Sequence, residues 1–251
     1  MIATLPMYDW PELRSDTDAY WQILRRHFAK AGFSPPDMRQ HVDDETHGWL
    51  EPGLFFSQTC GYPFISRLEG RVELLGTPHF DIDGWQGPNY SSAVIVQKDH
   101  EAQNLEQFRE GSRFAFNSSN SLSGYRCMTP LVGRPEDWFG EMIKSGGHRK
   151  SADMVADGRA DIAAIDALCW HLYAQIQPEQ AAQLRVLQWT PSLPGLPYIT
   201  NNNWTGVELQ SMRFALGDAV SEMANSKHNH LLQLRGVTHL NAAKYAPIRS
   251  L

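Results

Sequence analysis

The sequence has little positive charge and no long apolar run. Its 251 residues include 22 Lys and Arg against 28 Asp and Glu, the formal net charge is −6, and no Lys or Arg run exceeds three residues. Nucleic acid requires a basic stripe on its partner, so it is not expected to bind here. The longest apolar stretches, 162–165 and 167–170, fall far below the roughly 20 residues of a membrane-spanning helix. We therefore expect a soluble protein that is not inserted in a membrane.

Cysteine is also scarce. Cys60, Cys127 and Cys169 are odd in number and far apart, which indicates free thiols rather than a disulfide framework or a zinc site. No metal and no cofactor is expected. The first residues, 1–9, lack the basic segment and the long apolar core of a secretory signal peptide. As given, the sequence shows no export signal.

What is present is the pattern of an α/β protein. Hydrophobic residues make up 42% of the chain, and 15 Pro and 19 Gly favour many short elements joined by defined turns. Thr205 and Glu208 have capping-box spacing and predict an amphipathic helix. One face of that helix carries Leu209, Met212, Leu216, Val220 and Met223. Strands that alternate with helices predict parallel sheets, whose ligands bind beyond the carboxyl ends of the strands.

A serine-rich segment, 118–124, follows a predicted strand at 113–116 and is expected to open a helix. Hydroxyl groups and unpaired backbone N–H groups at such a turn are suited to hold an anion. The alternative is a surface loop with a simple N-cap. The segment lacks the glycine and lysine pattern of a nucleotide P-loop, so a nucleotide site is disfavoured.

A second helix start is predicted after residues 146–151, with Ser151 as its cap. His148 and Arg149 would then approach the same anion with donors that need no metal. A solvent-exposed histidine is the alternative interpretation. Cys60 could act as a nucleophile with His148 as its base, which is a weaker alternative.

Asp166 lies at the end of an apolar run that is predicted to be a buried strand. A carboxylate is costly to bury unless it is paired with a cation or a hydrogen-bond donor. Asp166 would therefore either meet the ammonium of a ligand or cap the helix that begins at Ala167.

Five short segments resemble a single family in their proper order: residues 5–9, 57–63, 87–90, 121–125 and 158–166. The family is that of the phosphate/phosphite/phosphonate substrate-binding proteins of ABC transporters. The resemblance spans about residues 3 to 200.

The resemblance implies an α/β, two-lobed fold of the periplasmic-binding-protein type 2, in which each lobe is a mostly parallel sheet flanked by helices. Lobe 1 would comprise residues 1–94 plus 196–251, and lobe 2 residues 95–195. Two hinge crossings are expected, near 91–96 and 194–199.

The family's Ser-x-Ser-Gly motif holds the phosphonate oxygens. The motif carries over to Ser121 and Ser123, with the backbones of Leu122 and Gly124 nearby. The central position is often hydroxylated in the family and is Leu122 here, which removes one side-chain donor. Further ligand-binding positions implied by the resemblance are His148, Asp166, Tyr90 near the hinge, and Tyr8, Thr59 and Cys60 in first-lobe loops that face the cleft.

The function that this resemblance implies is non-enzymatic binding of a phosphonate, phosphite or phosphate between the lobes, with no catalytic residue. An ABC permease is the implied partner, and a monomer is expected. One alternative is an enzyme on the same fold that resembles thiamine-pyrimidine synthase, with His148 and Cys60 reactive. Another is a cytosolic sensor that has lost transport. The compartment is the periplasm if the family role holds, or the cytoplasm if the export signal is truly missing.

Overall fold

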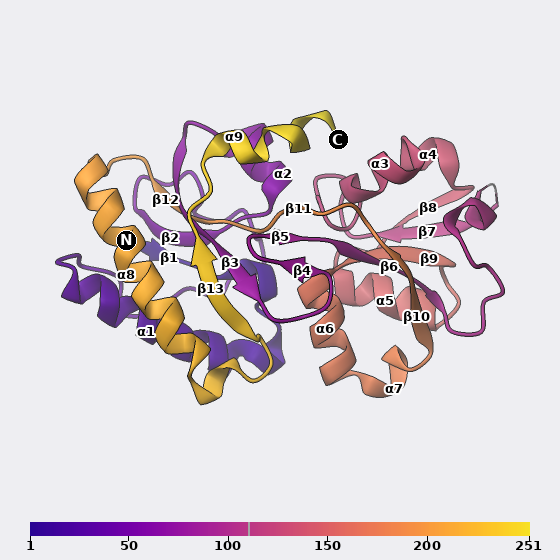
Figure 1. Cartoon of the computed structure of the whole chain (residues 1–251), viewed down its shortest axis with the longest axis horizontal. Helices are drawn as coiled ribbons and strands as arrows, with labels where there is room; N and C mark the ends of the chain where they lie inside the picture. The colour runs from indigo at the N-terminus through magenta and orange to yellow at the C-terminus, as the bar shows by residue number, and fades with distance from the viewer. Residues whose placement is uncertain (110) are drawn as a thin grey trace. The chain divides into compact units, whose positions relative to one another are not determined.

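The structure, a computed structural model, describes residues 1–109 and 111–251, and these residues form two compact units (Figure 1). Unit 1 consists of Met1–Asp81, Gln86–Pro88 and Pro194–Arg249, and unit 2 of Ile82–Trp85, Asn89–Leu193 and Ser250–Leu251. The chain therefore passes between the units within residues 81–89, again after Leu193, and once more after Arg249. The sequence prediction had the boundaries after residues 94 and 195.

Unit 1 is built on a five-stranded sheet of order β1-β2-β12-β3-β13. β1 and β2 are parallel, whereas β12 runs antiparallel to β2 and β3, and β13 runs antiparallel to β3. The strands are β1 (Ile2–Ala3), β2 (Leu54–Gln58), β3 (Val72–Phe80), β12 (Tyr198–Asn201) and β13 (Leu234–Thr238). All five residues of β2 are buried, as expected for a strand covered on both faces.

Two long helices of unit 1, α1 (Arg14–Lys30) and α8 (Gly206–Ala224), pack against each other (Figure 1). The predicted capping box is confirmed: Thr205 Oγ1 accepts from the Glu208 N–H at 3.3 Å, and Glu208 Oε2 accepts from the Thr205 N–H at 2.8 Å. The predicted apolar face of α8 is buried. Shorter helices are η1 (Pro6–Tyr8), η2 (Pro11–Leu13), α2 (Gly61–Pro63), η3 (Phe64–Leu68), η6 (Lys227–Asn229), α9 (Ala242–Tyr245) and η7 (Ala246–Ser250).

A buried arginine orders the polar, turn-rich segment that links α1 to β2. Arg39 donates to Asp9 at 2.8 Å, to Asp18 at 2.7 Å and to the Thr17 hydroxyl at 2.7 Å, and its side chain is only 1% exposed. Hydrogen bonds to Arg39 and His41 lower the pKa of the Asp9 carboxyl, although burial acts strongly in the opposite direction. The segment is therefore held by charge pairing rather than by regular secondary structure.

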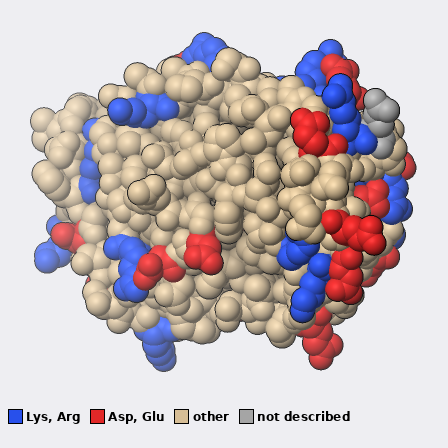
Figure 2. All heavy atoms as spheres, turned by 45° about the vertical axis from the view of Figure 1, so that its right-hand side comes forward, with Lys and Arg blue, Asp and Glu red and all other residues tan. Residues whose placement is uncertain are grey.

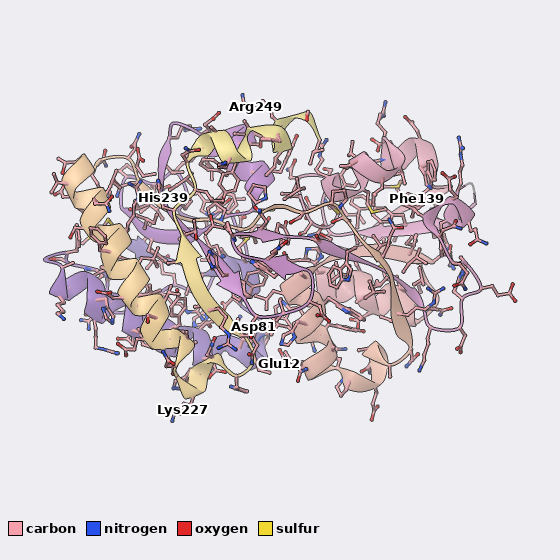
Figure 3. All side chains as sticks on the ribbon, viewed as in Figure 1. Glu12, Asp81, Phe139, Lys227, His239 and Arg249 are labelled. Carbon is pink, nitrogen blue, oxygen red and sulfur yellow. The ribbon has the colours of Figure 1, made fainter. Side chains whose placement is uncertain are left out.

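Unit 2 is built on a sheet of order β10-β6-β9-β7-β8. β7 is parallel to β8 and β9, whereas β6 is antiparallel to β9 and β10. The strands are β6 (Ser92–Gln97), β7 (Arg113–Phe116), β8 (Glu141–Lys144), β9 (Ile162–Asp166) and β10 (Leu184–Trp189). In the core of this unit, Phe114 of β7 stacks on Phe139 with ring centroids 4.7 Å apart. Figure 3 labels Phe139.

Helices α5 (His148–Ala156) and α6 (Ala167–Ile176) pack against strands β6 and β9. The other helical segments of unit 2 are η4 (Leu105–Phe108), η5 (Arg126–Met128), α3 (Thr129–Val132), α4 (Pro135–Trp138) and α7 (Pro178–Ala181). A small third sheet of order β11-β5-β4 is formed by β11 (Leu193–Pro194), β5 (Asn89–Tyr90) and β4 (Trp85–Gln86). Its residues belong to the stretches in which the chain passes between the units.

The α/β class with helix-flanked sheets is confirmed, but both large sheets are mixed rather than mostly parallel. Each sheet receives one interior strand, β12 or β6, that follows a passage between the units and runs antiparallel to both neighbours. A buried apolar run predicts a strand but does not encode its direction. The strand directions therefore followed from the chain's route and not from the hydrophobic pattern.

Acidic and basic side chains are interspersed on the face shown in Figure 2, and most of that face is uncharged. Over residues 1–109 and 111–251, no helix is both long enough and apolar enough to cross a membrane.

Candidate anion-binding site

Three of the predicted site regions of unit 2 follow neighbouring parallel strands. The serine-rich loop comes after β7, His148 comes after β8, and Asp166 is the last residue of β9. Because β8, β7 and β9 are parallel neighbours, their carboxyl ends meet at one edge of the sheet, which is where α/β proteins bind ligands. Residues from three separate parts of the sequence are thereby brought together.

The serine-rich loop is a series of turns and does not open an α-helix directly. Residues 118–124 contain no helix, and the 3₁₀ segment η5 and the four-residue α3 follow, the latter ending at Gly133 with a φ of +74°. The predicted helix start is therefore wrong, since the turn bonds within the loop compete with helical ones. Ser121 Oγ accepts from the Gly124 N–H at 3.0 Å, and the Ser118 carbonyl accepts from the Ser121 N–H at 3.0 Å.

Two backbone donors of this loop remain available to a ligand. Nothing in the described part of the chain accepts a hydrogen bond from the N–H of Leu122 or of Ser123. The Leu122 side chain is fully buried and anchors the loop in the core. An anion at this loop could therefore be held by two N–H groups and by hydroxyl groups, although Leu122 offers no hydroxyl.

His148 lies beside Ser123 at the start of α5. The helix begins at His148 with Gly147 as its N-cap residue, so the predicted cap at Ser151 is wrong. Ser151 instead lies within the first turns, buried, with its hydroxyl 2.6 Å from that of Ser145. The extended conformation of Gly147 starts the helix four residues earlier than the hydroxyl pattern indicated, which places the imidazole at the sheet edge.

The imidazole is held in a hydrogen-bond network. Its Nε2 lies 2.9 Å from Ser123 Oγ and 3.3 Å from Asn117 Nδ2, and the ring also donates to the Ala164 carbonyl. Burial lowers the pKa of His148 to about 4, and the bond to Ala164 opposes this only in part. The ring is therefore neutral near pH 7.

Asn117 is a residue of the site that sequence reasoning missed. Its Oδ1 accepts from the Ser118 N–H at 2.9 Å, which orients its amide NH₂ toward His148. The available signal was its position directly after the predicted strand, where an Asn side chain can bond to the loop backbone. That position alone does not identify its partner, because His148 is distant in the sequence.

Asp166 is 1% exposed and caps α6, with its Oδ1 accepting from the N–H groups of Leu168 at 2.9 Å and Cys169 at 3.1 Å. The cap that the sequence offered as one interpretation is confirmed. Tyr90 belongs to unit 2 and is 2% exposed, and its ring lies 5.1 Å from that of Trp85. It stands two residues before Ser92, which pairs with Asp166 across β6 and β9.

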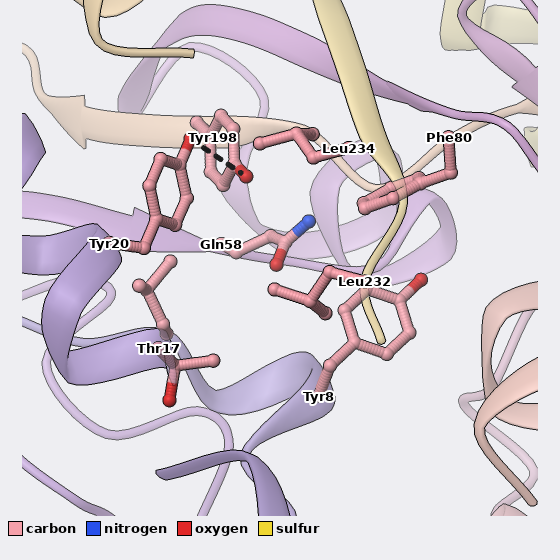
Figure 4. A pocket seen from close by; sticks show the side chains of 9 residues that line it. Tyr8, Thr17, Tyr20, Gln58, Phe80, Tyr198, Leu232 and Leu234 are labelled. Carbon is pink, nitrogen blue, oxygen red and sulfur yellow. Dashed lines mark hydrogen bonds between the residues drawn. The ribbon is translucent and has the colours of Figure 1, made fainter. Parts of the chain in front are cut away.

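The remaining predicted residues belong to unit 1. Thr59 and Cys60 follow β2 and are buried, and Cys60 is the N-cap residue of α2. Tyr8 lines a cavity of about 20 Å³ with Gln58 and Phe80 (Figure 4). On the far side of this cavity, the Tyr20 hydroxyl donates to that of Tyr198 at 3.3 Å. This cavity has room for about one water molecule. Among the described residues, no group of His, Cys, Asp and Glu side chains is arranged to hold a metal ion.

We expect Gly124→Ala to disrupt the loop. A Cβ at residue 124 would lie 1.9 Å from Asn117 Oδ1 and 2.6 Å from its Cγ, so the amide must move and lose its bonds to Ser118 and His148. The expected loss of stability is about 1 to 3 kcal/mol, measured by urea unfolding. In an Asn117→Ala background the same change should cost much less. Equal costs in the two backgrounds would show that Asn117 is not the obstacle.

Comparison with known proteins identifies the family. Residues 55–246 match the family model described as the periplasmic substrate-binding protein of phosphonate ABC transporters. The chain belongs to this family, whose members are substrate-binding components of transporters, and the predicted resemblance is confirmed. No curated protein sequence matches the chain significantly.

Solved structures show the same fold. A binding protein of an ABC phosphonate transporter from Pseudomonas aeruginosa is similar with a TM-score of 0.75 at 20% identity, over 99% of this chain and 84% of that one. PhnD1 of Prochlorococcus marinus, in complex with methylphosphonate, gives 0.76 at 16% identity over 99% and 96%. A Xanthomonas citri protein bound to ATP gives 0.71 at 15% identity over 100% and 98%. The periplasmic-binding-protein fold is thus confirmed.

Proposed function

We propose that this protein binds a small phosphorus oxyanion, with a phosphonate as the first candidate, at the loop of residues 117–124 in unit 2. The observation that carries this proposal is the set of donors on one loop: the N–H groups of Leu122 and Ser123 and the Ser121 hydroxyl. Such preorganised donors replace the hydration shell of an oxyanion. The family supports a phosphonate, and the similar P. marinus protein holds methylphosphonate.

Other predicted residues complete the proposal. Tyr90 and Asp166 of unit 2 are proposed to contact the substituent on phosphorus, and Tyr8, Thr59 and Cys60 of unit 1 to provide further ligand contacts. Binding would be reversible and without chemistry, and the bound ligand would be delivered to the permease of an ABC transporter, with the periplasm as the compartment.

Isothermal titration calorimetry of the full chain against methylphosphonate, phosphite and phosphate tests this proposal, with sulfate as a control anion. We expect one site per chain and the tightest binding for methylphosphonate. Native mass spectrometry of freshly purified protein would show whether a small anion is retained at unit stoichiometry. If none of the three phosphorus anions binds more tightly than sulfate, the proposal is wrong.

A further inference from the structure

The two hydroxyl groups of the loop differ in what they can offer a ligand. Ser121 Oγ accepts a hydrogen bond from the Gly124 N–H, so its own proton is free to be donated. Ser123 Oγ lies 2.9 Å from His148 Nε2. Whether Ser123 donates or accepts toward a ligand therefore depends on which ring nitrogen of His148 carries the proton.

The surroundings of His148 decide that question. Asn117 Oδ1 is engaged by the Ser118 N–H, so the amide presents its NH₂ to Nε2 at 3.3 Å. A protonated Nε2 would face this donor, whereas an unprotonated Nε2 accepts from it and from the Ser123 hydroxyl. Because Nε2 is occupied in this way, the ring N–H that donates to Ala164 is Nδ1–H.

The opposite tautomer has weaker support. It would place a lone pair on Nδ1 to accept from the Asp166 N–H, whose nitrogen is 3.4 Å away. The Nδ1–H tautomer gives up this contact. The contact is, however, longer than either contact at Nε2, and the opposite tautomer would leave the Asn117 NH₂ against another donor and the Ala164 carbonyl without the ring N–H. The network therefore selects Nδ1–H and an accepting Nε2.

Charged groups around α5 leave this assignment in place. The Asp166 carboxylate is directed to the N–H groups of Leu168 and Cys169. On the helix itself, Arg149 bonds to Gln177, and Asp153 bonds to Tyr173 and Gln177 of the packed α6 and α7 segment. At the amino-terminal ends of β7 and β9, away from His148, Arg113 and Asp161 bond to each other. Burial keeps the pKa of His148 at about 4, well below the range in which alkylphosphonates lose their second proton.

We propose that the site selects the singly protonated monoanion of its ligand, with Ser123 Oγ accepting a hydrogen bond from the P–OH group. This inference rests on the proposed function. The Ser123 hydroxyl donates to His148 Nε2 and has only lone pairs left for the ligand, while Ser121 and the two free N–H groups donate to the deprotonated oxygens. A dianion would place a charged oxygen against the lone pairs of Ser123, or would require protonation of the buried imidazole.

The test is the pH dependence of affinity for two probes, methylphosphonate and chloromethylphosphonate, measured by calorimetry on the full wild-type chain. The electron-withdrawing chlorine lowers the second pKa of the second probe. We expect affinity to fall about tenfold per pH unit above each probe's own second pKa, so that the two profiles break at different pH values. The difference between the breaks should equal the difference between the two second pKa values.

Other outcomes separate the two proposals. Profiles that break at one common pH would show that a protein group titrates, and profiles that stay flat or rise with pH would show that the dianion binds; either result overturns the inference while leaving the proposed function in place. Failure of both probes, and of phosphite and phosphate, to bind at any pH would overturn the proposed function itself.

A variant tests the role of Asn117 as a positioning residue. Asn117→Asp is nearly isosteric, but it presents an accepting oxygen to Nε2 and should move the ring proton there, which frees the Ser123 hydroxyl to donate. In the wild type we expect methylphosphonate affinity to fall about tenfold per pH unit above the second pKa of the ligand. In this variant we expect it to fall only about threefold or less per pH unit. Asn120→Asp, at an exposed position of the same loop, adds the same charge and should keep the wild-type profile shape. Identical profiles for the two variants would show that Asn117 does not set the tautomer.

Discussion

The double variant Ser121→Ala with Ser123→Ala should bind methylphosphonate at least about 100-fold more weakly than the wild type. Each hydroxyl is proposed to form a hydrogen bond to a charged ligand, and such bonds are worth roughly 1.5 to 3 kcal/mol each. Ser121→Ala also leaves the Gly124 N–H without its acceptor, and Ser123→Ala removes one partner of His148. Calorimetry measures the affinity, and thermal unfolding monitors the fold.

The matched control for this experiment is Ser119→Ala. Ser119 is exposed in the same loop, and its backbone carbonyl, not its hydroxyl, accepts from Arg126 at 3.0 Å. Its removal should leave affinity unchanged. Equal affinity of the double variant and the wild type for all three phosphorus anions would exclude the serine loop from the site.

Asp166→Ala should destabilise the protein by about 2 kcal/mol, because the N–H groups of Leu168 and Cys169 would lose a buried acceptor. Asp166→Asn keeps an oxygen at the cap position and removes only the charge. We therefore expect most of the lost stability to be absent in the Asn variant. Urea unfolding of the two variants side by side measures this difference.

The same Asn variant tests whether Asp166 also reads the ligand. If the carboxylate pairs with an ammonium group in a water-poor site, Asp166→Asn should weaken binding of aminomethylphosphonate by about 1 kcal/mol or more relative to methylphosphonate. For each ligand, the loss is the affinity of the wild type divided by that of the variant. The loss for aminomethylphosphonate should be about fivefold or more larger than the loss for methylphosphonate, on the scale of about 1.4 kcal/mol per tenfold change. An equal loss for both ligands would assign Asp166 to the helix cap alone.

Local sequence signals predicted the parts of the fold that depend on neighbouring residues. Thr205 and Glu208 are three residues apart and bond to each other's backbone, so the start of α8 and its buried face could be inferred from spacing alone. The motif order from residue 5 to residue 166 likewise predicted the family. The start of α5 was misplaced because Gly147 needs no hydroxyl to begin a helix, a possibility that propensity ranks below Ser151.

By itself, the sequence determined the α/β class, the family, and which loops carry hydroxyl, imidazole and carboxylate groups, since these depend on composition and on short-range spacing. Only the tertiary structure decided the mixed strand directions, the burial of His148 and its contacts with Asn117 and Ser123. These features depend on groups 25 and 31 residues apart in the chain that meet because β7 and β8 are parallel neighbours. A hydrogen bond between such groups produces no periodic pattern in either segment of the sequence. The sequence also does not distinguish a buried histidine from an exposed one.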